Sequence, residues 1–77
     1  MVKVLFFAHL RDEVGEESVE LNVTGKTVAE LKQLVAEKYD VQKLDQAMTA
    51  INEEFASNEE VIKDGDVVAL IPPVSGG

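Results

Sequence analysis

Apolar and polar side chains alternate with a period of two in several short segments of the chain. Residues 2–8, 18–23 and 67–71 show this alternation or a β-branched apolar run, which predicts β-strands. Residues 47–52 predict a further strand, and a turn is expected to begin at residues 52–55. The clean alternation of residues 18–23 is typical of a half-buried strand at the edge of a sheet.

One longer segment has helical rather than strand periodicity. Its apolar stripe predicts a helix over residues 28–39 and consists of Val28, Leu31, Leu34, Val35 and Tyr39. Thr27 and Glu30 have the spacing of a capping box, which places the start of the helix. The polar residues between the stripe positions are expected to face water: Lys32, Gln33 and Glu37.

The order strand, strand, helix, strand, strand predicts an α+β fold. A right-handed helical crossover lets the first and last strands lie parallel at the centre of a mixed sheet, with the one main helix on one face. This is a β-grasp, or ubiquitin-like, arrangement. We expect a single domain over residues 1–72, followed by a flexible C-terminal tail at 73–77. The predicted core comprises Val4, Phe6, Leu21, Leu31, Val35, Val68 and Leu70.

A single helix cannot cover both faces of this sheet, yet the central strands are apolar on both faces. Either the segments 9–17 and 40–46 fold over the second face, or that face is a protein interface. The side chains in question are Leu5, Phe7, Phe55, Val67 and Ile71.

Composition narrows the classes of function. The 77 residues carry a net charge of −8, which argues against nucleic acid as a partner and against anionic membrane surfaces. The chain has 45% hydrophobic residues but no apolar run of membrane-spanning length, and it has no cysteine. These features favour a small cytoplasmic protein.

No side-chain constellation predicts a catalytic or metal site. His9 is the sole histidine, and the acidic residues near it lack the alternating ligand pattern of a calcium loop. Asp64, Gly65 and Asp66 are more simply a tight turn. We therefore expect no metal and no bound cofactor, and we do not expect this chain to be an enzyme by itself.

The C-terminus is the feature most suggestive of chemistry. Pro72 and Pro73 end the last strand, and the chain finishes at Gly76 and Gly77 with a free carboxylate. A carboxylate is a poor electrophile, so it needs activation by another enzyme, for example as an acyl-adenylate. Glycines have no side chains and can thread a narrow channel, so the tail is a candidate chemical handle on a rigid support.

The sequence resembles a known family, the small sulfur-carrier subunit of molybdopterin synthase, along essentially its whole length. The most specific matching segments are Lys3-Val4-Leu5-Phe6-Phe7-Ala8 followed by Arg11, Ala50-Ile51-Asn52, Asp64-Gly65-Asp66-Val67-Val68-Ala69, and Pro72-Pro73-Val74-Ser75-Gly76-Gly77. The final Gly-Gly alone is common to all ubiquitin-like carriers, whereas its combination with the Phe-Phe-Ala start is specific.

The resemblance implies a protein cosubstrate. In that family an activating enzyme uses ATP to adenylate the terminal glycine, here Gly77, and sulfur then converts it to a thiocarboxylate. The loaded tail enters the large subunit, in an expected heterotetramer of two small and two large subunits, and gives its sulfur to a pterin precursor. The positions expected to contact partners are Phe7, Arg11, Phe55, Ile71, Pro73, Val74 and Ser75, besides Gly76 and Gly77.

Three other functions remain open from the residues. The chain could carry sulfur for thiazole synthesis or another thiolated metabolite, although thiazole carriers are usually shorter and lack the Phe-Phe-Ala start. It could be a ubiquitin-like modifier whose terminal glycine is joined to a lysine of a target protein. It could also be a binding module in which the sheet face docks a partner and the tail has no chemistry.

Overall fold

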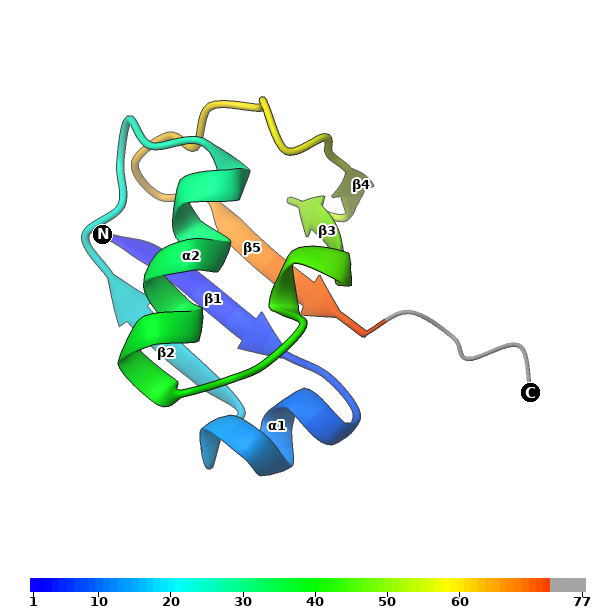
Figure 1. Cartoon of the computed structure of the whole chain (residues 1–77). Coiled ribbons are helices and arrows are strands. Elements are labelled where there is room, and N and C mark those ends of the chain that lie inside the picture. Colours follow the sequence, from blue (N-terminus) through cyan, green and yellow to red (C-terminus); the bar gives the residue numbers. More distant parts are fainter. Residues whose placement is uncertain (73–77) are drawn as a thin grey trace.

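Parallel pairing of the first and last strands organises the computed structural model, which describes residues 1–72. The sheet has the order β2-β1-β5-β3-β4, and β1 and β5 are parallel while the other neighbours are antiparallel (Figure 1). The elements are β1 (Val2–Phe6), α1 (His9–Val14), β2 (Ser18–Leu21), α2 (Val28–Tyr39), the 3-10 helix η1 (Leu44–Gln46), β3 (Met48–Ile51), β4 (Glu54–Phe55) and β5 (Val67–Ile71). The predicted β-grasp topology is confirmed.

The main helix begins and ends where the sequence predicts. The Thr27 side chain accepts a hydrogen bond from the Glu30 backbone N–H at 3.2 Å, and the Glu30 carboxylate accepts one from the Thr27 N–H at 2.9 Å. These two bonds satisfy donors that a helix start otherwise leaves unpaired. At the other end, Asp40 adopts a left-handed conformation and terminates α2.

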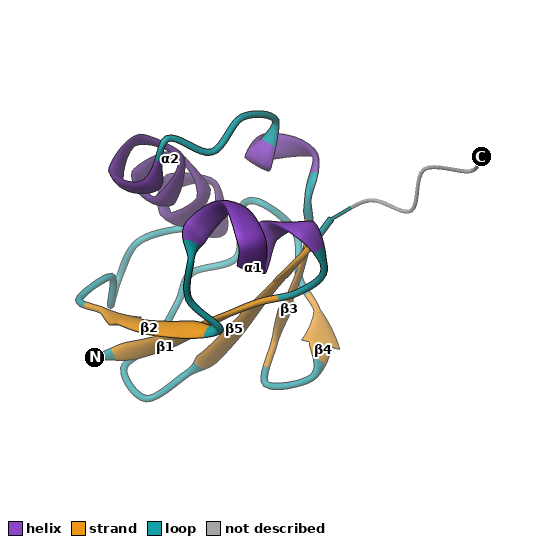
Figure 2. Ribbon diagram, turned by 90° about the horizontal axis from the view of Figure 1, so that it is seen from below, coloured by secondary structure: helices purple, strands orange, loops and turns teal. Residues whose placement is uncertain are grey.

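All three helices lie on one side of the sheet, as the view along its edge shows (Figure 2). Leu10 of α1 is 3% exposed and Leu44 of η1 is 2% exposed, and both belong to the core under α2. The segments that could have folded over the second face therefore pack on the helical side. All seven predicted core residues are buried: Val4, Phe6, Leu21, Leu31, Val35, Val68 and Leu70.

The prediction that Lys32 faces water is wrong. Its side chain is buried, and its ammonium donates hydrogen bonds to the Ala47 carbonyl at 2.7 Å and to Asn58 Oδ1 at 3.0 Å. Residue 32 flanks the apolar stripe, so its methylene stem packs along the core while the charged end reaches polar atoms. Burial lowers the pKa of the Lys32 ammonium, and the negative charge of Asp45 offsets part of that effect.

The predicted turn at residues 52–55 is also partly wrong. Asn52 and Glu53 form the turn and both have positive φ, after which β4 pairs Phe55 with Ala50 and Glu54 with Ile51. A two-residue loop with both φ values positive matches the twist of a hairpin, which explains the extra short strand. At the chain's start, β1 ends at Phe6 rather than at residue 8 because a tight turn leads into α1.

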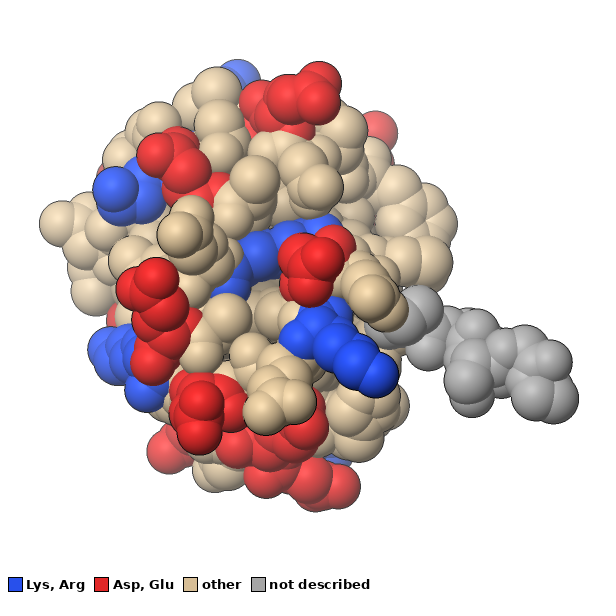
Figure 3. Space-filling model, viewed as in Figure 1, with Lys and Arg blue, Asp and Glu red and all other residues tan. Residues whose placement is uncertain are grey.

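Charged groups are scattered over the face that carries α2, with acidic side chains in excess (Figure 3). This distribution is typical of a solvated surface rather than of a focused binding site. In the described part of the chain, no helix is both long enough and apolar enough to cross a membrane.

Replacement of Leu31 by alanine should destabilise the fold by about 2–5 kcal/mol, because it removes a fully buried side chain from the centre of the core. Chemical denaturation would measure this loss, with Gln33→Ala on the exposed side of α2 as the control. A Leu31→Ala protein as stable as the Gln33→Ala control would contradict the assigned core.

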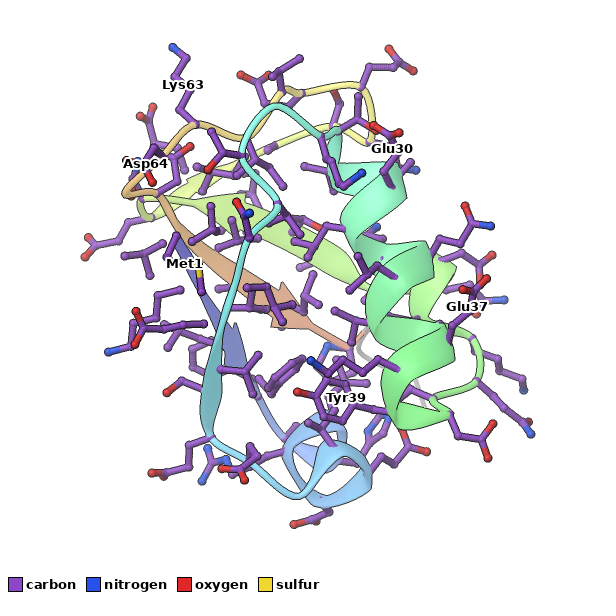
Figure 4. All side chains as sticks on the ribbon, turned by 90° about the vertical axis from the view of Figure 1, so that its left-hand side faces the viewer. Met1, Glu30, Glu37, Tyr39, Lys63 and Asp64 are labelled. Carbon is purple, nitrogen blue, oxygen red and sulfur yellow. The ribbon has the colours of Figure 1, made fainter. Side chains whose placement is uncertain are left out.

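Stability should also depend on the ionisation of Glu30, which lies at the amino end of α2 (Figure 4). Hydrogen bonds from the backbone and side chain of Thr27 lower the pKa of Glu30 below its ordinary value of 4.5. The ionised carboxylate therefore stabilises the folded state above that ordinary value, and the stabilisation disappears as the pH falls through the lowered pKa.

Glu30→Gln keeps a side chain that can cap the helix but cannot ionise. Denaturation of the natural chain and of Glu30→Gln measures the free energy of unfolding of each at neutral and at acidic pH. The difference between the two values should become smaller on acidification. A difference in unfolding free energy that stays constant across that pH range would show that the charge of Glu30 contributes nothing to stability.

Candidate functional site: the open face of the sheet

The face of the sheet opposite the helices carries an almost continuous apolar surface. Strand register places Leu5 beside Ala69, Ala69 beside Ala50, and Ala50 beside Phe55, in one row across four strands. At the carboxyl end of β5, Ile71 pairs with Met48, and Phe7 follows β1 beside them with its N–H bonded to the Leu70 carbonyl. We call this surface the open face, and its apolar members are Leu5, Phe7, Met48, Ala50, Phe55, Val67, Ala69 and Ile71.

The centre of the open face is hollowed because its middle positions are small. Ala50 and Ala69 have only methyl groups, whereas Leu5 and Phe7 stand to one side of them. The resulting depression has a volume of about 450 Å³, and Asn52, Glu53 and Val67 also line it. A shallow apolar depression with larger side chains around it is suited to receive apolar side chains of another protein.

The predicted contact residues on this face differ in exposure. Phe55 is 76% exposed and Phe7 is 39% exposed, while Ile71 is half-buried beside Met48. Exposure of phenylalanine rings to water is unfavourable in free energy, so a surface of this kind indicates a protein interface. Sequence reasoning missed Met48, which is 42% exposed, although strand alternation opposite the buried Thr49 would have placed it on this face.

Arg11 lies on α1, which follows Phe7 after a short turn. Its Nη1 atom is 3.7 Å from Glu17 Oε1, and both side chains are largely exposed. An exposed ion pair of this kind contributes little to stability. The guanidinium therefore stays accessible on α1, which packs on the helical side of the sheet.

The C-terminal tail begins at the carboxyl end of the central strand β5. Ile71 is held by pairing with Met48, and Pro72 is buried against the protein. The chain therefore leaves the domain from a fixed point at one end of the open face. The tail positions predicted to act, Pro73, Val74, Ser75, Gly76 and Gly77, lie outside the described residues.

The other candidate ligands form no metal site in the part of the chain that the structure describes. His9 is exposed on α1, and no group of three or more histidine, aspartate or glutamate side chains in residues 1–72 could hold a metal ion. Gly65 has a φ of 85°, so the segment 64–66 is a turn. Within that turn, Asp66 accepts hydrogen bonds from Lys63 N–H and the Asn52 amide, which is a structural role.

Comparison with known proteins agrees with the fold. The ThiS family model matches residues 4–77. The molybdopterin synthase sulfur carrier subunit of Escherichia coli is 38% identical, with all of both chains aligned. Subunit 1 in a complex of subunits 1 and 2 of molybdopterin-converting factor from Helicobacter pylori is 31% identical, with a TM-score of 0.68, covering 99% of this chain and 97% of that one.

A third similar protein is the small archaeal modifier protein 1 of Methanosarcina acetivorans. Its structure gives a TM-score of 0.82 at 27% identity, covering 99% of this chain and 95% of that one. The fold thus defines a ubiquitin-like β-grasp protein, and one face of its sheet is apolar and uncovered in residues 1–72. The chain belongs to the ThiS family, and within it to the sulfur carrier subunits of molybdopterin synthase.

Proposed function

We propose that this protein delivers sulfur from a thiocarboxylate at Gly77 while its open face is docked on the large subunit of molybdopterin synthase. The observation that carries the proposal is the position of the open face at the root of the tail, where Ile71 ends β5 and Phe7 is hydrogen-bonded to the preceding Leu70. A partner that covers this face has the start of the tail at its surface. Family membership supplies the class of chemistry.

The terminal carboxylate is the group that reacts, and partner enzymes catalyse its reactions. An activating enzyme transfers the adenylyl group of ATP to the Gly77 carboxylate with release of pyrophosphate. Hydrosulfide released by a donor protein then attacks the acyl carbon and displaces AMP, which leaves a thiocarboxylate. ATP is thus bound and used by the activating enzyme, and the carrier itself binds no cofactor. The sequence contains no cysteine that could relay the sulfur internally.

The large subunit is the partner that receives the sulfur. It takes the loaded tail into its active site, where the thiocarboxylate sulfur bonds to the pterin precursor, and water then hydrolyses the resulting thioester to restore the Gly77 carboxylate. A dithiolene needs two sulfur atoms, so two loaded carriers are consumed for each product, in an assembly of two small and two large subunits. The solved complex of the two Helicobacter pylori subunits supports a stable pairing of this kind.

A second function is favoured by the likeness to the archaeal modifier protein. A modifier would use the same activated glycine, but a lysine amine of a target protein would displace AMP to form an isopeptide bond. Carriers for thiazole or other thiolated products would differ in the partner that docks on the open face. Isopeptide-linked conjugates in cells would identify a modifier.

We place the carrier reaction in the cytoplasm, in keeping with the absence of cysteine.

Phe7→Ala should weaken binding of the large subunit by about 1–4 kcal/mol, as expected for an aromatic interface anchor. The stability of the free chain should change much less, because the ring is 39% exposed. Isothermal titration calorimetry and chemical denaturation measure the two effects, with Gln33→Ala on the helical side as a control. Unfolding of the Phe7→Ala monomer with no change in its residual binding would place Phe7 in the core and remove the argument for the interface.

Deletion of Gly77 should abolish sulfur delivery without affecting folding or docking. The new terminal carboxylate, on Gly76, would stop about 3.3 Å short of the reacting groups of each partner. Reaction rates fall steeply for errors in position near 1 Å. The assay is formation of molybdopterin from purified activating enzyme, ATP, a sulfur source and the large subunit.

A chain extended by one residue after Gly77 is the matched variant, because it misplaces the carboxylate in the opposite direction. Both variants should bind the large subunit with unchanged affinity through the open face. Normal turnover with either variant would show that the terminal carboxylate is not the reacting group.

A further inference from the structure

The backbone at Ala8 has a conformation that alanine rarely adopts. Its φ is 53° and its ψ is −134°, and the Leu10 N–H donates a hydrogen bond to the Phe7 carbonyl at 3.1 Å. Residues 7–10 therefore form a tight turn with Ala8 at its first central position. These angles are those of a type II′ turn, in which this position is dominated by glycine because a side chain there is strained.

The surrounding structure holds this turn on both sides. Before it, the Phe7 N–H donates to the Leu70 carbonyl of β5 at 3.3 Å. After it, the Arg11 N–H donates to the Ala8 carbonyl at 3.1 Å, and Leu10 is buried in the core. Glycine would fit the same turn without strain. The stability of the folded chain therefore does not account for alanine at this position.

The strained residue lies between two predicted partner contacts. Phe7 precedes it on the open face, and Arg11 follows it on α1. The Phe7 N–H is bonded to the carbonyl of Leu70, so the turn begins next to the carboxyl end of β5, from which the tail leaves. Strained backbone that the surroundings enforce is often found at binding sites, where it pre-organises the contacts.

We propose that Ala8 is a positioning residue, whose restricted backbone fixes the Phe7 ring relative to Arg11 for docking of the large subunit. The inference rests on the proposed function and adds a residue that acts through its neighbours. Glycine at this turn can move over a wide range of φ and ψ, whereas the Cβ atom of alanine closes most of that range and leaves Ala8 in the conformation that the neighbouring hydrogen bonds impose. The turn with alanine consequently loses less conformational freedom when a partner binds.

A competing explanation is that the exposed Ala8 methyl group contacts the partner directly. D-alanine separates the two explanations, because positive φ is the favoured region for a D-residue and the turn stays restricted. The methyl group then points in a different direction. Ala8→D-Ala thus relieves the strain and keeps the restriction, whereas Ala8→Gly relieves the strain and loses the restriction.

A chain of 77 residues is within reach of chemical synthesis, so three full-length chains can be compared: the natural sequence, Ala8→Gly and Ala8→D-Ala. Thermal unfolding measures the strain, and calorimetric titration with the large subunit measures docking. Both variants should unfold about 4–8 °C higher than the natural chain, the shift expected for a small domain that is relieved of modest strain. Affinity should fall about 3–10-fold for Ala8→Gly and stay within about 2-fold for Ala8→D-Ala.

Asp40→Gly is the matched control, because Asp40 has a φ of 55° at the end of α2, far from the tail root in the sequence. Its affinity for the large subunit should match that of the natural chain. Equal loss of affinity in Ala8→Gly and Ala8→D-Ala would show direct contact by the methyl group and overturn the positioning role. Unchanged affinity in Ala8→Gly, or a lower unfolding temperature, would overturn it as well.

Phe7→Ala in the same titration separates this inference from the proposed function. If Phe7→Ala weakens docking and Ala8→Gly does not, the docking surface stands and the role of Ala8 is wrong. If Phe7→Ala binds as tightly as the natural chain, the open face is not the docking surface, and both proposals fail.

Discussion

The parallel pairing of β1 with β5 is the constraint on which the rest of this structure depends. It joins residues near the two ends of the chain, with Val4 beside Val68 and Phe6 beside Leu70. Parallel neighbours cannot be connected by a tight turn, so the intervening chain must cross over, and α2 is that crossover. The same pairing holds β5 at the centre of the sheet and thereby fixes the point from which the tail leaves.

The crossover also decides which face of the sheet is left uncovered. α1, α2 and η1 all pack on one side, where their leucines complete the core, and nothing else in residues 1–72 is available for the other side. A chain of this size buries only about 60% of its unfolded surface, so an uncovered apolar face is physically tolerable. The cost is exposed aromatic surface at Phe7 and Phe55, which docking on a partner would remove from water.

Much of the fold could be predicted because local signals and the global topology agree. The capping box at Thr27 and the turn at Gly65 are encoded within a few residues, and the helix and last strand have the predicted bounds. The open face could also be predicted, because the central strands are apolar on both faces and a single main helix can cover only one face of the sheet. Lys32 was mispredicted because its environment is made by Ala47 and Asn58, which only tertiary packing brings to it. The strained positive φ of Ala8 could not be predicted either, because an alanine in the sequence does not indicate that its φ will be positive.

The central claim is that this chain carries sulfur on its terminal glycine, and the mass of the intact protein from cells tests it most directly. Cells that make molybdopterin should contain a fraction of the chain heavier than the encoded sequence by the exchange of one oxygen for sulfur. Fragmentation should place that exchange at Gly77, and the heavier form should accumulate when the large subunit is absent. A chain with only the encoded mass in such cells, or one found attached to lysines of other proteins, would contradict the account.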